Sequence, residues 1–261
     1  MNSYSFKYKN GRYYLKYFGS ESYYKNGLLL ECVYHFKNLM KGSLLDLGCG
    51  NKPYSVIYND VCDSSAGCDV PFSIHKDANV EVLCYAEDID LHFKPCSFDC
   101  ILCTEVLEHT VNDQKVILNA FKMLKEGGYL LISAPFTYVM HEAPHDFRRY
   151  TYYGLKDILE RNNFQVLSAF SMGATFSSGL YIFYSSAMKI FYFILKKSGF
   201  RNAPDNSFLR AFTSFPEYLF YKLYIPLFRK KLRDNKLPST NEIFSSLGYF
   251  FVARKLNNNP Q

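Results

Sequence analysis

The sequence predicts an α/β fold with a doubly wound, mainly parallel sheet of seven strands. Two observations carry this prediction. Short apolar runs that suit buried strands alternate with stretches whose apolar residues recur at helical spacing. Two of the runs end in glycine or in an acid, as expected where parallel strands reach the carboxyl edge of a sheet. This alternation requires helices on both faces of the sheet.

The expected strands follow one another along most of the chain. They cover residues 43–47, a run that ends at 68–69, and residues 80–85, 98–103, 129–133, 164–168 and 249–253. Helices are expected over residues 22–40, from Asn112 or Asp113 to Gly127, and over residues 155–161. The last two strands are too far apart for one helix, so a helical insertion is expected between them.

We therefore divide the chain into four parts. They are an N-terminal helical segment (1–42), a ligand-binding core (43–175), an aromatic and basic helical insertion (176–240), and the last strand of the core with its tail (241–261). The length of 261 residues suits one large α/β domain with an insertion better than two full domains.

The eight cysteines do not indicate a disulfide framework. Several interrupt apolar runs, where a free thiol behaves as a small buried hydrophobe. The first residues lack a long apolar stretch, so no secretory leader is expected and a reducing cytoplasm is predicted. Cys100 and Cys103 should point to opposite faces of one strand and so cannot share an ion. No metal site is predicted.

The glycines after the first strand of the core indicate a ligand site. Gly48 and Gly50 let the backbone approach a ligand closely. A dinucleotide pattern would need a third glycine where the chain has Pro53. Asp46 would repel a phosphate and attract a cation, and Asp69 can accept bonds from two ribose hydroxyls. This order favours a cationic nucleoside ligand over a plain turn.

Residues 43–171 resemble the class I, Rossmann-like S-adenosylmethionine-dependent methyltransferases, in the branch often called type 11. The matching stretches occur in the family's order; they are residues 45–54, 86–88, 97–101, 104–109 and 124–128. The resemblance implies a Rossmann-like methyltransferase fold and S-adenosylmethionine as cofactor. The residues that it places around this cofactor are Asp46, Gly48, Cys49, Gly50, Asp69, Glu87, Asp88 and Glu105.

Within that set, the resemblance implies separate places for the parts of the cofactor. The glycine stretch with Asp46 lines the methionyl and sulfonium side, and Asp69 holds the ribose. Glu87 and Asp88 fall near the adenine, and Glu105 closes the pocket. Many family members have an acid two residues before the position of Glu87, where this chain has Tyr85.

The acceptor side is expected in residues 140–151 and in the loop after the fourth strand. Methyl transfer to a hydroxyl needs an aligned nucleophile and a base, and histidine suits that task at neutral pH. The candidate bases are His145 with Asp146, or His141 with Glu142. Candidate substrate ligands, with the arginines as clamps for an anionic group, are Arg148, Arg149, Tyr150 and His109. The alternative is a stapled loop with one arginine paired to Asp146.

The insertion carries the basic character of the chain. Residues 176–237 contain eleven Lys and Arg but only Asp205, Glu217 and Asp234, whereas the whole chain has a net charge of +6. Residues 218–228 are aromatic and apolar, and clustered cations follow at 229–233. This pattern fits a helix on an anionic membrane surface, or equally a helical lid on the sheet. Scattered serines disfavour a spanning helix, and no nucleic-acid module is present.

These observations leave three hypotheses for function. The first is methyl transfer to a hydroxyl, or less readily a carboxyl, of a glycan or lipid-linked envelope precursor. It is suggested by a Pro-His-Asp-x-x-Arg-Tyr-Thr stretch at 144–151, which is similar to methyltransferase-like proteins of bacterial surface-polysaccharide gene sets. The second is methylation of a quinone-like or other apolar small molecule. The third is a cofactor-binding protein without catalysis. The expected location is the cytoplasm, with a peripheral contact at the inner face of the membrane as one option.

Overall fold

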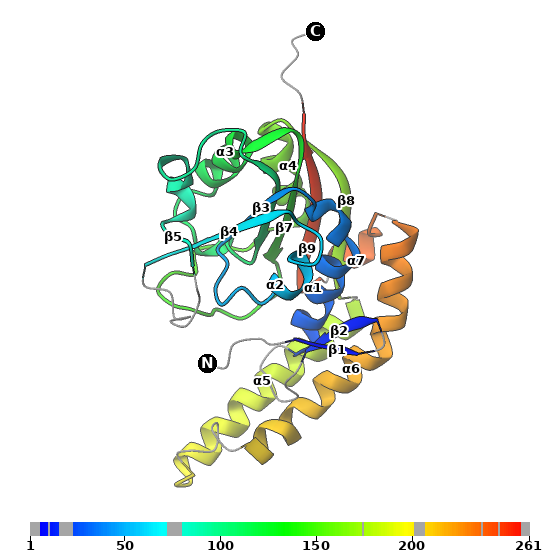
Figure 1. Ribbon diagram of the computed structural model, residues 1–261. Helices are drawn as coiled ribbons and strands as arrows, with labels where there is room; N and C mark the ends of the chain where they lie inside the picture. The colour runs from blue at the N-terminus through cyan, green and yellow to red at the C-terminus, as the bar shows by residue number, and fades with distance from the viewer. Residues whose placement is uncertain are drawn as a thin grey trace.

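The computed structural model describes residues 6–9, 11–15, 23–71, 80–173, 175–200, 207–235, 237–244 and 246–256. Its centre is one seven-stranded sheet of order β5-β4-β3-β6-β7-β9-β8 (Figure 1). The strands are β3 (Ser43–Leu47), β4 (Ser64–Asp69), β5 (Val82–Leu83), β6 (Phe98–Thr104), β7 (Leu124–Pro135), β8 (Phe164–Met172) and β9 (Gly248–Lys255). Neighbours from β5 to β7 are parallel, and β9 is antiparallel to both β7 and β8. The predicted fold class is confirmed.

Helices cover both faces of this sheet. They are α1 (Tyr23–His35), α2 (Ser55–Tyr58), α3 (Asp113–Met123), α4 (Tyr152–Arg161), α5 (Thr175–Lys197), α6 (Ser207–Asp234) and α7 (Thr240–Phe244), with 3-10 turns η1 (Lys37–Met40), η2 (Ala86–Leu91) and η3 (Leu107–His109). One core holds α3 and α4 against the sheet, and the other holds α1, α2 and α6. Because strand side chains alternate, Cys100 lies in the second core and Cys103 in the first.

Three local expectations differ from the structure. The helix expected to reach Gly127 ends at Met123, because Leu124 takes an extended backbone and pairs with Phe98. The strand expected over residues 80–85 is only two residues long. It lies at the edge of the sheet, where it can form hydrogen bonds with one neighbouring strand only. The N-terminal segment, expected to be helical over residues 1–42, also contains a strand hairpin of β1 (Phe6–Lys9) and β2 (Arg12–Leu15). Ser22, where the first helix was expected to begin, lies outside the described residues.

Helices α5 and α6 lie side by side and project away from the sheet (Figure 1). The inner face of α6 packs on α1 through Tyr221, Tyr224 and Phe228, which are all buried. The approach is close, because a Cβ at Gly27 of α1 would overlap the ring of Tyr221. The insertion is therefore helical in its described residues, and α6 is anchored to the N-terminal helix.

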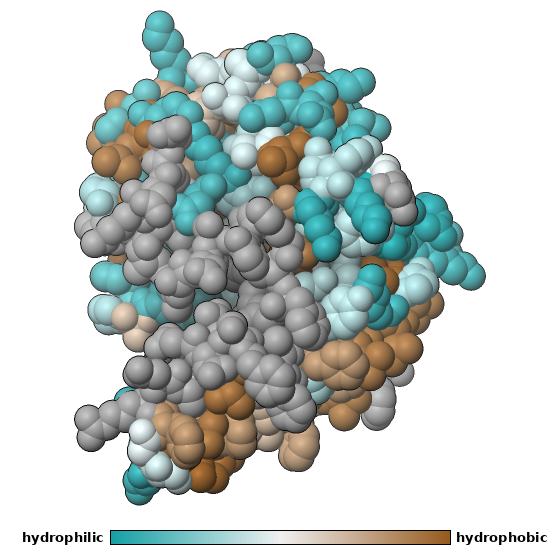
Figure 2. Space-filling view, turned by 60° about the horizontal axis from the view of Figure 1, so that its bottom comes forward, coloured by the Kyte–Doolittle hydropathy of each residue, from teal (hydrophilic) through white to brown (hydrophobic). Residues whose placement is uncertain are grey.

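Much of α5 stays exposed. Ser178–Lys197 is long and apolar enough to cross a membrane by length and composition, and only 12% of its most apolar window is buried. Its exposed apolar side chains include Phe183, Ile190, Phe193 and Ile194. Figure 2 shows hydrophobic surface gathered in the lower part of the view, the side from which the two helices project.

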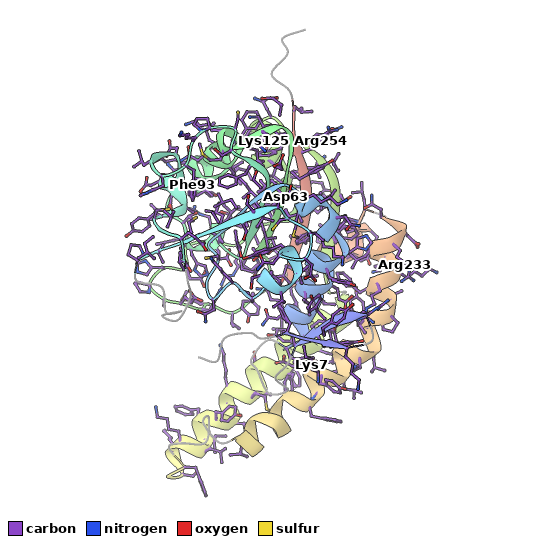
Figure 3. All side chains as sticks on the ribbon, in the orientation of Figure 1. Lys7, Asp63, Phe93, Lys125, Arg233 and Arg254 are labelled. Carbon is purple, nitrogen blue, oxygen red and sulfur yellow. The ribbon has the colours of Figure 1, made fainter. Side chains whose placement is uncertain are left out.

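The cations near the end of α6 divide into two kinds. Arg229 forms an ion pair with Glu31 of α1, and Lys231 forms one with Glu242 of α7. Lys230 and Arg233 are exposed, and Arg233 points outward from α6 (Figure 3). Half of the predicted basic cluster is therefore used to hold the helices together.

The pair between Arg229 and Glu31 predicts a stability effect. The Glu31 side chain is only 9% exposed, and its Oε2 accepts a bond of 2.8 Å from Arg229 Nε. Removing the guanidinium leaves a buried carboxylate without its counter-charge, so Arg229→Ala should lower the free energy of unfolding by about 3 kcal/mol. Urea denaturation measures it. The matched change Lys230→Ala, one residue along the same helix, should alter stability by less than about 0.5 kcal/mol; equal losses would contradict the assignment.

Candidate functional site

The loop after β3 is a tight turn built on glycine. Gly48 and Gly50 have φ values of 68° and 50°, a region that favours glycine. The amides of Gly48 and Cys49 both donate to the Cys68 carbonyl of β4, at 2.9 and 3.0 Å. A Cβ at Gly48 would also overlap the side chain of Val106. The loop is thus held to the carboxyl edge of the sheet by two backbone hydrogen bonds, and position 48 needs glycine for its positive φ and its close approach to Val106.

Two acids flank this loop. Asp69 ends β4, and its carboxylate accepts bonds from the amides of Gly50 (2.8 Å) and Val70 (2.7 Å). Asp46 is buried in β3 and accepts a bond from the Tyr58 hydroxyl at 3.1 Å. Burial raises the pKa of Asp46 to about 7. A cation bound nearby would favour its ionised form.

The glycine loop and the two acids beside it fit S-adenosylmethionine. A positively charged ligand gains from the ionisable Asp46, and the carboxylate of Asp69 is a two-oxygen acceptor at the end of the neighbouring strand. The loop leads into α2, a helix of only one turn, so there is no long helix of the kind that receives a pyrophosphate. The cofactor supplies a methyl group already activated by its sulfonium charge.

The two acids expected near the adenine face the start of α3. Glu87 accepts bonds from the amides of Val111 (2.8 Å) and Asn112 (3.3 Å). Asp88 forms an ion pair with Lys115 at 2.7 Å. Both side chains thus fix the loop that borders this part of the edge, and their contact with adenine stays a prediction.

Glu105 lies at the centre of a buried network after β6. It has a φ of 56°, unusual for a residue with a side chain, and accepts a bond of 2.8 Å from Ser133 Oγ. Its other oxygen pairs with Lys25 of α1, whose ammonium also lies 3.9 Å from the centre of the Tyr138 ring. Burial opposes the charge of Lys25, but the carboxylate of Glu105 outweighs it and the pKa of Lys25 is raised.

The loop after β7 brings together a different histidine–acid pair from those expected. Asp146 Oδ2 lies 3.4 Å from His141 Nδ1, accepts a bond from the His141 amide, and pairs with Arg149. His145 has an exposed side chain, 6.2 Å from the ring of Phe147 between centroids, and its carbonyl lies 2.6 Å from His109 Nδ1. Burial, followed by His109 and Lys25, lowers the pKa of His141, so His141 is a neutral base at pH 7.

The remaining residues expected to bind the acceptor have partners within the protein. Arg148 donates to the carbonyls of Thr110 (3.0 Å) and Val111 (3.1 Å). Tyr150 is buried, and its hydroxyl donates to Asp113 at 2.7 Å. The pairing of Arg149 with Asp146 matches the stapled-loop alternative. The clamping of an anionic acceptor by these side chains stays a prediction.

Two residues of this edge escaped the sequence analysis. Glu108 is fully buried in η3, and neither of its carboxylate oxygens has a hydrogen-bond partner. Its place directly before His109, which the sequence analysis selected, was a usable signal. Lys25 precedes Leu28 and Leu29 by three and four positions, which places it on their buried face. Its partner, eighty residues along the chain, could not be predicted.

Comparison with known proteins agrees with this geometry. A family model described as a methyltransferase domain matches residues 27–172, more than half of the chain. Among curated proteins, a ubiquinone biosynthesis O-methyltransferase of Rickettsia bellii is 25% identical over 117 residues, which are 41% of this chain and 48% of that protein. The chain thus spans about half the length of the curated relatives it matches.

Solved structures share the fold. An S-adenosylmethionine-dependent methyltransferase from Archaeoglobus fulgidus superposes with a TM-score of 0.51 at 14% identity, covering 88% of this chain and 92% of that one. A Burkholderia thailandensis 1,6-didemethyltoxoflavin-N1-methyltransferase was solved with 1,6-didemethyltoxoflavin and S-adenosylhomocysteine bound. It superposes with a TM-score of 0.50 at 12% identity, covering 88% of this chain and 78% of that one. At such low identity, the likeness concerns the fold.

The assignment of Asp69 to the ribose predicts a binding defect. Asp69→Asn should weaken the binding of S-adenosylhomocysteine by roughly tenfold or more, because hydrogen bonds to a charged acceptor are worth about 1.5–3 kcal/mol. Isothermal titration calorimetry measures the affinity. Asp63→Asn is the matched control, since Asp63 is exposed just before the other end of β4 (Figure 3). Unchanged affinity in folded Asp69→Asn would remove Asp69 from the site.

Proposed function

We propose an acceptor for this chain, which belongs to the methyltransferase-domain family and is an S-adenosylmethionine-dependent methyltransferase. The proposed acceptor is the hydroxyl of a quinone-like aromatic molecule that resides in a membrane. In the proposed reaction, Asp46, the glycine loop and Asp69 hold the cofactor, and the side chains after β6 and β7 receive the hydroxyl. The third hypothesis, a cofactor-binding protein without catalysis, is not favoured, because the chain belongs to a methyltransferase family.

The observation that carries this proposal is the aromatic and histidine-rich wall on the acceptor side. The rings of His109 and His141 meet edge to face with centroids 4.8 Å apart, and Tyr138 meets His141 in the same way at 5.3 Å. Tyr138 also stacks with Tyr181 of α5. Such rings suit a planar apolar ligand. The named activity of the Rickettsia relative supports an aromatic O-methyl acceptor as well.

Methylation of a lipid-linked glycan is the second candidate. The Pro-His-Asp-x-x-Arg-Tyr-Thr stretch favours it, and a phosphate in the lipid linkage would call for cationic side chains. Arg149 is paired with Asp146, and Arg148 bonds two backbone carbonyls. Because both guanidinium groups already have partners, the contacts favour the aromatic acceptor.

In the proposed reaction His141 takes the proton of the acceptor hydroxyl. Its lowered pKa keeps it neutral at pH 7, and Asp146 lies beside its Nδ1. An acid at Nδ1 fixes the tautomer in which Nε2 is free to accept a proton and stabilises the imidazolium that results. His145, the other expected base, has an exposed side chain and is the weaker candidate.

We also propose that the protein is cytoplasmic and contacts an anionic membrane surface through α5. The exposed apolar residues of α5 lie beside Lys189, Lys196 and Lys197, which are exposed too. An apolar face bordered by cations suits the boundary between headgroups and acyl chains. Tyr181 of the same helix stacks with Tyr138 of the acceptor wall, so this contact would bring the bilayer close to the site.

The acceptor assay is the central test. With methyl-labelled S-adenosylmethionine, the protein should label phenolic quinone precursors and leave lipid-linked glycans unlabelled. His141→Ala should lower the rate by roughly 100-fold, the lower end of what a general base contributes, while S-adenosylhomocysteine still binds. Asp69→Asn reports loss of the cofactor for comparison. Labelling of the glycan fraction alone would replace the first acceptor with the second.

The membrane contact predicts a flotation result. The wild-type protein should float with vesicles of phosphatidylglycerol and phosphatidylcholine, and less at high salt. Replacing Ile190, Phe193 and Ile194 with Gln should lower the bound fraction by at least tenfold, because each buried apolar side chain contributes roughly 1.5 kcal/mol or more. Leu91→Gln, which changes an even more exposed leucine of η2, is the control. Equal flotation of the triple variant would rule α5 out as the contact.

A further inference from the structure

Three side chains that could bind a metal converge at the carboxyl edge of the sheet. Glu108 and His109 come from η3 after β6, and His141 comes from the loop after β7. One possible ligand atom from each lies within 4.8 Å of the others. In the described residues, this is the one group of three or more His, Cys, Asp or Glu side chains close enough to share an ion.

The buried side chain of Glu108 is the reason to expect a ligand at this cluster. Its side chain is fully buried, yet both carboxylate oxygens lack a hydrogen-bond partner. His109 Nε2 lies 3.7 Å from Oε1 of Glu108, which is too far for a hydrogen bond. Buried carboxylates in proteins are paired, hydrogen-bonded or coordinated to a metal, because an isolated one is costly.

The two imidazoles are oriented from behind. His109 Nδ1 lies 2.6 Å from the carbonyl oxygen of His145. His141 Nδ1 lies 3.3 Å from the carbonyl oxygen of Val139 and 3.4 Å from Asp146 Oδ2. An acceptor at Nδ1 places the proton there and leaves a lone pair on Nε2. Protein metal sites commonly use this arrangement, in which a carbonyl or carboxylate behind each histidine sets its tautomer.

We propose that Glu108, His109 and His141 bind a divalent transition-metal ion, with Zn²⁺ as the reference ion. Two neutral imidazoles and one carboxylate suit zinc and similar first-row ions, whereas Mg²⁺ and Ca²⁺ prefer all-oxygen ligands. Three protein ligands leave coordination positions open, as in sites that bind a substrate and unlike closed structural sites. The two cysteines considered in the sequence, Cys100 and Cys103, are a different group and lie on opposite faces of β6.

The role of this ion rests on the proposed function. The cluster includes two rings of the aromatic wall, those of His109 and His141. When the ion is bound, His141 is its ligand, and it is the general base only in the metal-free protein. An acceptor hydroxyl that coordinates the ion loses its proton more readily, since a bound cation lowers the pKa of an oxygen ligand. The proton then passes to water in place of His141. The oxygen lone pair forms the new bond to the methyl carbon as the carbon–sulfur bond breaks, which yields the methyl ether and S-adenosylhomocysteine.

Metal binding is measured without any acceptor. After incubation with Zn²⁺ and dialysis, the wild-type protein should retain one ion per chain by plasma mass spectrometry. Co²⁺ in its place should show visible absorption bands of a nitrogen and oxygen site. Glu108→Gln keeps the shape and removes the charge, and His109→Ala removes one imidazole. Each should weaken Zn²⁺ binding by at least tenfold. His92→Ala, which removes an exposed histidine of another loop, should bind as the wild type does.

The same samples separate this inference from the proposed function. S-adenosylhomocysteine should bind the Glu108→Gln and His109→Ala variants with unchanged affinity, which shows that they are folded. If the wild-type protein retains no Zn²⁺, or if all four proteins bind it equally, the metal site is wrong, whichever acceptor is methylated. If Zn²⁺ binds as expected but phenols are not labelled, the site stands and the acceptor is wrong.

Discussion

The ion pair between Lys25 and Glu105 ties together the parts of the molecule that must meet at the site. Lys25 comes from the helix that precedes the sheet, and Glu105 from the end of a central strand. Ser133 of the next strand and the Tyr138 ring complete the surroundings. Both charges are shielded from water, with side chains 4% and 18% exposed, so losing either partner would leave an uncompensated charge at a cost of about 3 kcal/mol. The position of α1 is therefore set by charge as well as by apolar packing.

Local patterns were sufficient to predict the frame of the fold. The run before Gly48 and the run of Phe98 to Cys103 are too apolar and too short for surface helices, and both are central strands. Asn112 was expected as a helix cap, and its side chain accepts the Lys115 amide. The β1–β2 hairpin was missed although Asn10-Gly11, a common hairpin signal, lies between its two strands in the sequence. The contact that joins it to α2, from the Tyr13 hydroxyl to the Val56 carbonyl, could not be predicted from spacing.

The candidate site also has a part that local sequence patterns predict and a part that they do not. The predicted cofactor residues Asp46, Gly48, Gly50 and Asp69 lie at the ends of two successive strands, so their spacing alone predicts that they share an edge. The acceptor side is assembled from three distant segments. His141 meets Asp146 and not its neighbour Glu142, because the folded loop places Asp146 Oδ2 against both the amide and the ring of His141. Lys25 and Glu108 owe their importance to partners, or to a missing partner, that only the folded chain reveals.

The insertion between β8 and β9 has a consequence for how the chain is made. Strand β8 contacts the sheet only through β9, the last described strand to be synthesised. While α5 and α6 are being synthesised, β8 therefore has no partner strand. The apolar faces of both helices are exposed during the same period. The sheet is therefore completed late in translation. A nascent chain that stalls within α6 would expose its apolar surfaces to chaperones or to a nearby bilayer.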